Sequence, residues 1–361
     1  MAITKIPAAG FSDAVNFRNI IINGDMSVAQ RGTSKSSLST GFNTIDRFEI
    51  LKSNDAAFTE SQSTDVPTGQ GFANSWKIEC TTADTSLDAS NYLTWRQPIE
   101  AQNLQYLKFG TSSAESITLS FWVKSTKTGT YIVSLRNMDN SRLNAQSYTI
   151  SSSATWEKKT ITFDGDTSSG FNNDNGEGLR VQFSLLAGTD YTSGTLQTTW
   201  GTYAHANSAV GQVNFADSTS NELYLTGVQL EVGTSASDFE FLPHDVNLQR
   251  CQRYFFSLGG SATYQTYGYG MCFSTTAGMI GVPYPTTMRS APTVSTETLA
   301  SFVTKSGSQL GGAPTSLVAD FPGINFANVE LGGLSSMTNK DALRLYTNNS
   351  TATRLEFNAE L

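Results

Sequence analysis

The chain of 361 residues is long enough for two or three domains at roughly 150 residues each, and only 15% of its residues are charged. Its 31 Asp and Glu outnumber its 23 Lys and Arg, which gives a net charge of −8. An acidic protein lacks the basic surface that binding to a phosphate backbone requires, so we expect no nucleic acid partner. We also expect no membrane insertion, because the longest early apolar run, residues 20–22, is too short to span a bilayer.

Polar uncharged residues and aromatic rings take the place of the missing charge. The sequence holds 30 Gly, 21 Phe, 13 Tyr and 5 Trp, a mixture that favours strands and turns over helices. We therefore predict an all-β protein. The three cysteines, Cys80, Cys251 and Cys272, lie far apart without a C-x-x-C pair, which predicts buried free thiols rather than a disulfide framework or a zinc site.

Residues 1–44 form a lead-in with little periodicity. Its first part nevertheless carries apolar side chains at Ile3, Ile6, Phe11, Val15 and Phe17. A segment with apolar residues but no strand or helix pattern is expected to become ordered against a partner protein or a neighbouring subunit.

Alternation of apolar and polar residues predicts a series of strands after the lead-in. The runs at residues 117–124 and 131–135 are joined by a short link ending in Gly129, which predicts an antiparallel hairpin. A third strand is expected around Ile161 and Phe163. The clearest pattern is the fourth, in which apolar residues 179, 181, 183 and 185 alternate with Arg180, Gln182 and Ser184.

Two further features complete this first domain. Residues 164–178 consist almost entirely of turn formers and predict a surface loop, whose Asp164, Asp166 and Asp174 are weak calcium candidates without the register of a known calcium loop. In the run from 223 to 232 the apolar parity changes at Gly227, which predicts a bulge. Strands at this spacing predict a jelly-roll β-sandwich over residues 45–243.

A smaller second domain is predicted over residues 244–361. It begins with a short helix after Pro243, with Asp245 as its cap and Leu248, Cys251 and Phe255 at helical spacing. The chain closes in strict alternation, with Leu355, Phe357, Ala359 and Leu361 on one face, which predicts a terminal strand. This domain is therefore also expected to be β.

The residues offer little for catalysis. Only two histidines, His205 and His244, are available for a nucleophile–base pair, and no phosphate-binding or dinucleotide-binding motif occurs. We therefore expect no cofactor and no enzymatic activity. Pairs of carboxylates remain open as glycoside-hydrolysis candidates, because 31 acidic residues allow many pairings that a sequence cannot resolve.

Aromatic side chains are the remaining binding candidates, because sugar rings pack on flat apolar rings while polar neighbours bind the hydroxyl groups. Trp76 is in phase with Ile78 and Cys80 and is expected to fill the core. The glycan-binding candidates are Trp95, Trp200, Tyr264, Tyr267 and Tyr269.

Several blocks of residues together resemble a module found in structural proteins of tailed bacteriophages, especially tail-fibre-like and other appendage proteins. The first block is Asn19-Ile-Ile-Ile-Asn-Gly-Asp-Met26, followed by residues 30–33 and 46–48. The second comprises residues 227–233, 239–240 and 251–255, and the third comprises residues 288–294 and 358–361. The blocks keep their order along nearly the whole chain, although no repeat array or coiled-coil shaft typical of a fibre is present.

The resemblance implies a virion protein that is assembled in the bacterial cytoplasm, with other virion proteins as partners and a homotrimeric state. It also implies a sandwich similar to carbohydrate-binding modules, no catalytic residues, a turn at Asn23-Gly24 and a buried or interfacial pair of Asp46 with Arg47. The function that we predict is a non-enzymatic tail fibre or appendage subunit that binds host surface polysaccharide and is anchored to the virion by residues 1–17. The alternatives are a capsid decoration or head-fibre protein, a glycan-degrading virion depolymerase, and a bacterial surface adhesin.

Overall fold

The computed structural model describes residues 17–296, 298–307 and 309–361. By the packing of its backbone the chain divides into two units, of which the first comprises residues up to Ser27, Ser34–Asn43 and Phe48–Leu242. The second comprises Val28–Thr33, Thr44–Arg47 and Pro243–Leu361. The predicted lead-in of residues 1–44 is thus divided between the units, and the long segment of the second unit begins at Pro243.

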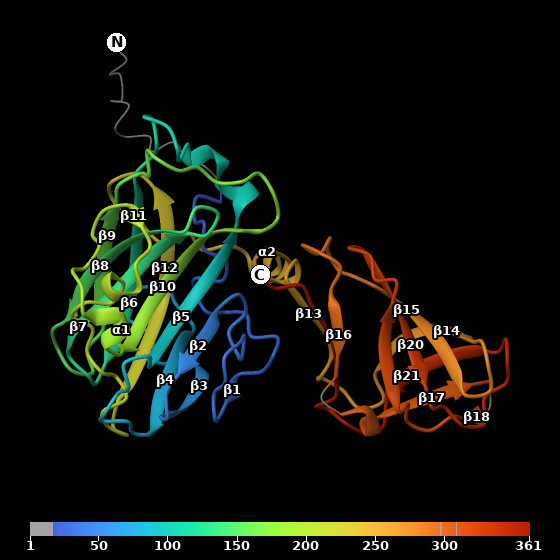
Figure 1. Cartoon of the computed structure of the whole chain (residues 1–361). Coiled ribbons are helices and arrows are strands. Elements are labelled where there is room, and N and C mark those ends of the chain that lie inside the picture. The colour runs from blue at the N-terminus through green and yellow to red at the C-terminus, as the bar shows by residue number, and fades with distance from the viewer. Residues whose placement is uncertain (1–16, 297, 308) are drawn as a thin grey trace, which may run out of the picture. The chain divides into compact units, whose positions relative to one another are not determined.

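The first unit is a jelly-roll β-sandwich of two antiparallel six-stranded sheets (Figure 1). One sheet has the order β1 (Ser34–Lys35), β3 (Ala57–Ser63), β4 (Ser75–Thr82), β12 (Glu222–Val232), β6 (Ile117–Ser125) and β9 (Glu157–Phe163). The other, called here the pocket sheet, has the order β11 (Gly201–Thr202), β8 (Arg142–Ile150), β7 (Gly129–Asn137), β10 (Glu177–Ala187), β5 (Tyr92–Glu100) and β2 (Glu49–Ser53). A 3₁₀ helix at Ala101–Leu107, the single-turn helix α1 (Thr189–Thr192) and a 3₁₀ turn at His205–Asn207 lie in its connections.

Most of the predicted strands of the sandwich are present, and the bulge at Gly227 is confirmed by a register shift in β12. The predicted hairpin between residues 117–124 and 131–135 is wrong. β6 pairs with β9 and β12, whereas β7 pairs with β8 and β10 in the opposite sheet. Both strands bury one face in the same core, so period-two alternation is identical whether the next strand pairs with its neighbour or crosses to the other sheet.

The core of the sandwich is a stack of aromatic rings between the sheets. Trp95 of β5 lies 3.9 Å from Phe48 and 4.6 Å from Trp76 of β4, measured between ring centroids, and also packs on Phe183. All of these rings except Phe48 carry no solvent exposure, and Phe48 is 2% exposed. Trp76 is therefore confirmed as a core residue, and the three cysteines are confirmed as buried free thiols.

The second unit is also β. Its three-stranded sheet has the order β13 (Phe255–Gly259), β22 (Arg354–Asn358) and β16 (Thr293–Ser295). Its seven-stranded sheet has the order β18 (Gln309–Leu310), β17 (Phe302–Ser306), β21 (Ala342–Thr347), β14 (Thr266–Cys272), β15 (Ala277–Pro283), β20 (Phe326–Gly332) and β19 (Ser316–Asp320). One buried cluster, including Leu355 and Phe357 of the predicted terminal strand, fills the space between the two sheets.

The predicted helix is present as α2 (His244–Gln252), but its details differ from the prediction. Pro243 rather than Asp245 occupies the cap position, and Asp245 lies in the first turn. Phe255 begins β13 rather than continuing the helix. A further 3₁₀ helix spans Leu299–Ser301. No helix of the described residues is long and apolar enough to cross a membrane.

Both residues of the expected Asp46–Arg47 pair are buried, and burial raises the pKa of Asp46, which the positive charge of Arg47 acts to lower. Asp46 also pairs with Arg31 at 3.9 Å, and Arg47 also pairs with Glu360. Arg31 also reaches Glu360 at 3.2 Å. The two guanidinium groups stack on the rings of Phe255 and Tyr254, at 3.5 and 3.4 Å. Residues from two separate strips of the lead-in therefore complete this unit.

Candidate functional site

The face of the pocket sheet that points away from the core carries a set of polar side chains on β5 and β10. In β5 the core takes Leu93 and Trp95, so Thr94 and Arg96 project to the other side. In β10 the apolar residues of the predicted amphipathic strand are buried in the core. Arg180, Gln182 and Ser184 therefore face outward, on the same side as Thr94 and Arg96. The register places Gln182 opposite Arg96 and Ser184 opposite Thr94, which brings the two polar rows together.

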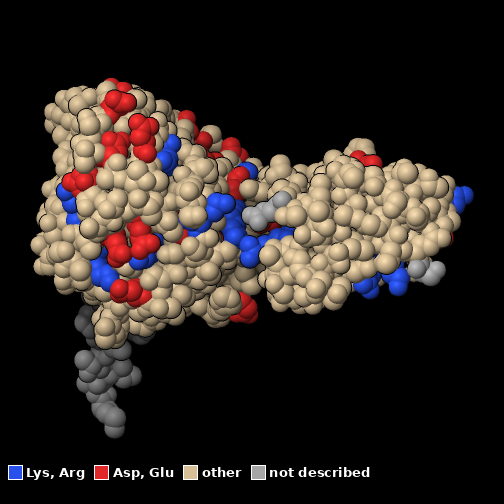
Figure 2. All heavy atoms as spheres, turned by 90° about the horizontal axis from the view of Figure 1, so that it is seen from below, with Lys and Arg blue, Asp and Glu red and all other residues tan. Residues whose placement is uncertain are grey.

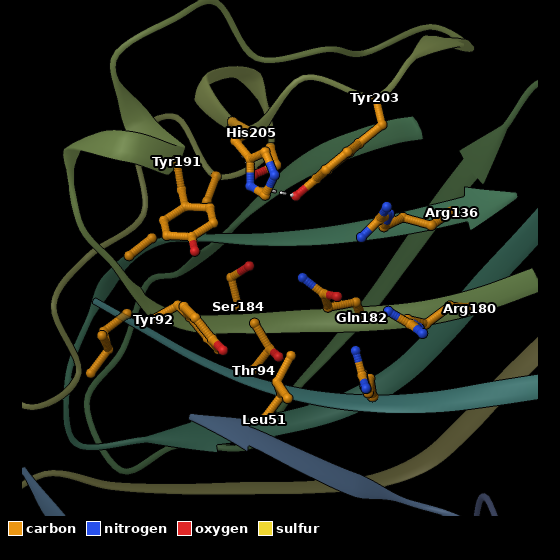
Figure 3. A pocket seen from close by; sticks show the side chains of 15 residues that line it. Leu51, Tyr92, Thr94, Arg136, Arg180, Gln182, Ser184, Tyr191, Tyr203 and His205 are labelled. Atoms are coloured by element: carbon orange, nitrogen blue, oxygen red, sulfur yellow. Dashed lines mark hydrogen bonds between the residues drawn. The ribbon is translucent and has the colours of Figure 1, made fainter. Parts of the chain in front are cut away.

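A long connection between β10 and β12 builds a wall over one side of this face. Leu196 and Tyr203 of the connection pack on a small cluster formed by Ile132, Leu143 and Ala145 of the sheet. The wall contributes Tyr191 from α1 and also Tyr203 and His205, whose side chains point toward the sheet (Figure 3). The sheet is therefore covered at β7 and β8 and open over β5 and β10.

The sheet and the wall enclose a half-open pocket of about 170 Å³ (Figure 3). This volume is below the ~300–1,000 Å³ of pockets that enclose a whole small ligand. The pocket therefore suits one unit of a longer chain, with the remainder of the chain in solvent.

Three tyrosine rings and a histidine ring line the wall side of the pocket. The Tyr92 and Tyr191 rings meet edge to face at 5.5 Å, and His205 lies 5.6 Å from Tyr191 and 4.8 Å from Tyr203. The Tyr203 hydroxyl and His205 Nδ1 are 3.2 Å apart and share a hydrogen bond. Burial, followed by the neighbouring Tyr92 and Tyr203, raises the pKa of Tyr191, so this phenol is neutral at physiological pH.

Three arginines, one each from β5, β7 and β10, also line the pocket. Arg96 donates to Glu49 at 2.7 Å, and Arg180 makes a two-point contact with Glu177 at 2.6 and 2.7 Å. Arg136 instead stacks on Tyr203, with its guanidinium carbon 3.7 Å from the ring centroid. Figure 3 shows Arg136, Arg180 and Gln182 converging on the same side of the pocket.

This combination of groups can contact a sugar. Flat rings provide surfaces for the apolar face of a sugar, and amide, hydroxyl and guanidinium groups bind its oxygens. The lining contains no Asp or Glu. No group of three metal-binding side chains occurs within residues 17–296, 298–307 and 309–361.

The predicted glycan-binding residues lie apart from one another, and none of them lines the pocket. The prediction that Trp95 binds a glycan is wrong, because Trp95 has no solvent exposure and lies on the core side of β5. Trp200 donates its indole N–H to the Asp164 carbonyl at 2.6 Å and packs on Phe109, outside the pocket lining. Tyr267 is buried and donates to the Thr353 carbonyl at 2.7 Å, whereas Tyr264 and Tyr269 are 56% and 68% exposed in the second unit.

The three weak calcium candidates do not form a ligand group among the described residues. Asp166 is buried in a two-point contact with Arg142 and also accepts the Ser168 N–H at 2.9 Å, so its oxygens already have partners. Asp174 accepts the Gly176 N–H at 2.9 Å. Of the residues predicted to anchor the chain, Ile3, Ile6, Phe11 and Val15 lie outside the described part, and Phe17 is 55% exposed.

Sequence reasoning missed every residue of the pocket lining. The signal was present in two strands, because the polar rows of β5 and β10 were visible as the faces opposite Trp95 and opposite the apolar residues of β10. No such signal existed for Tyr191, Tyr203 and His205, which lie in a connection without periodicity. Their position depends on the packing of that connection on the sheet.

Comparison with known proteins gives likenesses of low similarity. No family model matches the chain, and no curated protein matches it. Among solved structures, the enzymatically active domain of a tailspike protein from bacteriophage CBA120 is 10% identical over 60% of this chain with a TM-score of 0.32, and this chain covers 22% of that domain. A family 11 carbohydrate-binding module from Clostridium thermocellum, solved with a mixed-linked tetrasaccharide, is 11% identical over 57% of this chain and 99% of its own, with a TM-score of 0.29. At these scores the likenesses do not assign a function to this chain.

Proposed function

We propose that the first unit binds a carbohydrate chain in the pocket of its pocket sheet, and that the protein is a non-enzymatic virion component directed at host surface glycan. The observation that carries the binding proposal is the lining of the pocket. Tyr92, Tyr191 and Tyr203 offer ring surfaces beside Gln182 and Ser184, whose side chains make no hydrogen bond to other described residues. Polar groups of this kind, at the edge of an aromatic wall, remain available for sugar hydroxyls.

The binding proposal is tested with a glycan array that carries neutral and acidic oligosaccharides, followed by titration calorimetry. Tyr191→Ala and Gln182→Ala should each weaken binding about ten-fold, because each removes a ring surface or an amide from the contact. Tyr269→Ala is the matched control, since Tyr269 is an exposed tyrosine of the second unit. If Tyr269→Ala abolishes binding while the pocket variants bind like the wild type, the site lies in the second unit and the proposal is wrong.

Cleavage is not part of the proposed function. Hydrolysis of a glycosidic bond by the two-carboxylate mechanism needs a pair of Asp or Glu residues at the sugar, and the pocket lining holds neither. A polysaccharide that binds the purified chain should therefore keep its length on prolonged incubation. Release of short oligosaccharides would support the depolymerase alternative instead.

The virion role is supported by the sequence blocks that resemble phage appendage proteins. Several of these blocks pack on one another in the structure: the Val228 N–H donates to the Gly24 carbonyl at 2.9 Å, and Arg289 donates to the carbonyls of Ala359 and Glu360 at 2.7 and 2.8 Å. We propose a homotrimeric tail fibre or appendage subunit anchored by the segment before Asn19. Light scattering should give three times the chain mass of 38.9 kDa, and deleting residues 1–17 should abolish incorporation into particles.

A monomer in solution would favour the decoration or head-fibre alternative, in which the particle supplies the symmetry. The number of copies per particle then separates the two roles, because a decoration protein is present in many more copies than a tail fibre.

A further inference from the structure

The charge of the pocket is opposite to that of the whole molecule. The chain carries a net charge of −8, and the face shown in Figure 2 carries charged groups of both signs on a largely uncharged surface. The pocket lining, by contrast, contains Arg96, Arg136 and Arg180 and no carboxylate. A local excess of positive charge in a hollow attracts anionic groups even when the protein is acidic overall.

Two of the three arginines are neutralised by carboxylates beside the pocket, and one is not. Glu49 pairs with Arg96 and Glu177 pairs with Arg180. Arg136 makes no ion pair with any residue of the described part, and its Nε is buried without a hydrogen-bond partner there. Arg136 also lies directly opposite Arg180 on the neighbouring strand, which places two like charges side by side.

The electrostatic cost of Arg136 is compensated only in part within the described protein, by the Tyr203 ring and by the nearby Glu177. Burial lowers the pKa of the Arg136 guanidinium from its ordinary value. Tyr203 and Glu177 act to raise this pKa, whereas the positive charges of Arg180 and Arg96 act to lower it. Arg136 as a whole is half-buried, and a cation that is partly removed from water without an ion pair is stabilised by an anion that binds it. The floor of the pocket also presents Thr94, which is 5% exposed and whose Oγ1 has no hydrogen-bond partner among the described residues.

We propose that the pocket selects an anionic sugar unit, one that bears a carboxylate or a phosphate group, and that Arg136 binds that group. This inference rests on the proposed glycan-binding function and narrows its ligand. The planar fork of a guanidinium presents two parallel N–H donors that match a carboxylate or a phosphate. The sugar ring then lies toward Tyr92 and Tyr191 on the wall side, and Gln182 and Ser184 are in reach of its hydroxyls.

The first test uses the wild-type protein and two ligands that differ only in charge. Oligogalacturonate and its fully methyl-esterified form have the same rings and linkages, and we expect the free acid to bind at least about ten-fold more tightly at low salt. The preference should shrink as the salt concentration rises, because screening weakens the contact. Equal or tighter binding of the ester would exclude a carboxylate, and the same result for a phosphorylated ligand against its neutral counterpart would overturn the inference.

A third ligand distinguishes the two sources of negative charge. An oligosaccharide of neutral sugars with a terminal hexose 6-phosphate is titrated beside the oligogalacturonate. Tighter binding of either ligand than of its neutral counterpart supports an anionic unit, and the tighter of the two identifies the anion as carboxylate or phosphate.

Substitution of the arginine tests its role in selectivity. Arg136→Gln should lower the ratio of the affinity for the free acid to that for the ester about ten-fold. Arg344→Gln is the matched control, because Arg344 stacks on Tyr346 in the second unit at 4.3 Å, outside the pocket. If Arg136→Gln does not fold, the affinities of Thr94→Val and of the wild type for the acid and for the ester still test whether the pocket selects an anion.

The outcomes separate this inference from the proposed function. If neutral glycans of the array bind in the pocket and anionic ones do not, glycan binding stands and the selection of an anion is wrong. If no glycan binds the wild-type chain, both fail together.

Discussion

The stability of the second unit depends on a cluster of buried charged side chains. Glu360 is the shared partner of Arg31 and Arg47, and the side chains of all three are less than a tenth exposed. Ion pairs of this kind contribute little net stability while intact, but removing one partner leaves the other charges buried and uncompensated.

Glu360→Gln should therefore lower the free energy of unfolding of the second unit by about 3 kcal/mol. Urea unfolding followed by circular dichroism measures the change. Glu330→Gln is the control, because Glu330 makes no ion pair within the described part of the chain. Equal midpoints for the two variants would show that the cluster is not needed for stability.

A second residue-scale feature is the contact of Asp65 with Lys124 and Trp156 on the outer face of the other sheet of the sandwich. Asp65 accepts a hydrogen bond from the Trp156 indole at 3.1 Å and pairs with Lys124. Although burial alone acts to raise it, the pKa of Asp65 is lowered below its ordinary value of 3.8 by these two hydrogen bonds. A carboxylate with a lowered pKa stabilises the folded state above its unfolded pKa and loses that contribution as the pH falls through the folded pKa.

The melting temperature of the wild type should accordingly fall as the pH drops below about 4, the ordinary pKa of an Asp, and Asp65→Asn should reduce this fall. Asp65→Asn should also melt earlier than the wild type at neutral pH. Asp320→Asn removes a carboxylate that makes no ion pair within the described residues and is the control for the change of composition. A wild type and an Asp65→Asn variant with parallel pH profiles would contradict this account.

At the scale of elements, the segment from Asn19 to Met26 provides hydrogen-bond partners for the backbone of β12 at its bulge. Asn19 accepts the Leu230 N–H and donates to the Val228 carbonyl, both at 3.1 Å, and the Gly24 carbonyl accepts the Val228 N–H. The expected turn after Asn23 is confirmed by the hydrogen bond from the Met26 N–H to the Asn23 carbonyl at 3.0 Å. The bulge thus finds its hydrogen-bond partners in a segment about 200 residues away.

Gly24→Ala should lower the free energy of unfolding of the sandwich by about 1–3 kcal/mol, because the added Cβ must displace backbone. The added Cβ would lie 2.0 Å from the Val228 carbonyl oxygen. Gly323→Ala is the control, since its Cβ would meet only the Phe326 carbonyl oxygen, at an ordinary 3.5 Å. Thermal unfolding of the two variants measures the difference, and a Gly24→Ala protein as stable as the control would refute the close approach.

The strands were predictable from sequence to a large extent, and their partners were not. Alternation in β6, β7, β10 and β22 identified the buried face of each strand, because one face meets the core. The same alternation carried no information on which sheet a strand joins, so the hairpin of β6 with β7 was predicted wrongly. Trp95 was singled out for its ring, yet the residues that line the pocket are its neighbours Thr94 and Arg96.

At the scale of the whole molecule, the second unit is built from discontinuous chain. Residues 28–33 and 44–47 belong to it, although most of the sandwich separates them from Pro243. The change of composition after residue 243 indicated a second domain, but the two strips have neither strand periodicity nor an unusual composition. The stacking of Arg31 and Arg47 on the rings of Phe255 and Tyr254, and their ion pairs with Glu360, reveal where the strips belong.

A fragment of residues 243–361 should therefore fail to unfold cooperatively, because it lacks both arginines and exposes the two rings that they cover. Adding a peptide of residues 28–47 in trans should restore part of the transition, and the same peptide with Arg31→Gln and Arg47→Gln is the control. A fragment that unfolds alone at the midpoint of the full chain would show that the strips are dispensable.

The interleaved units have a consequence for how the gene can vary. A single crossover between two related genes at the codons around Leu242 joins a second unit to strips that evolved with a different partner, so the buried charges meet the wrong neighbours. Exchange of whole domains is therefore penalised in this architecture. We expect recognition to diversify instead by substitutions in the outward rows of β5 and β10 and in the wall above them, where the sandwich core is left intact.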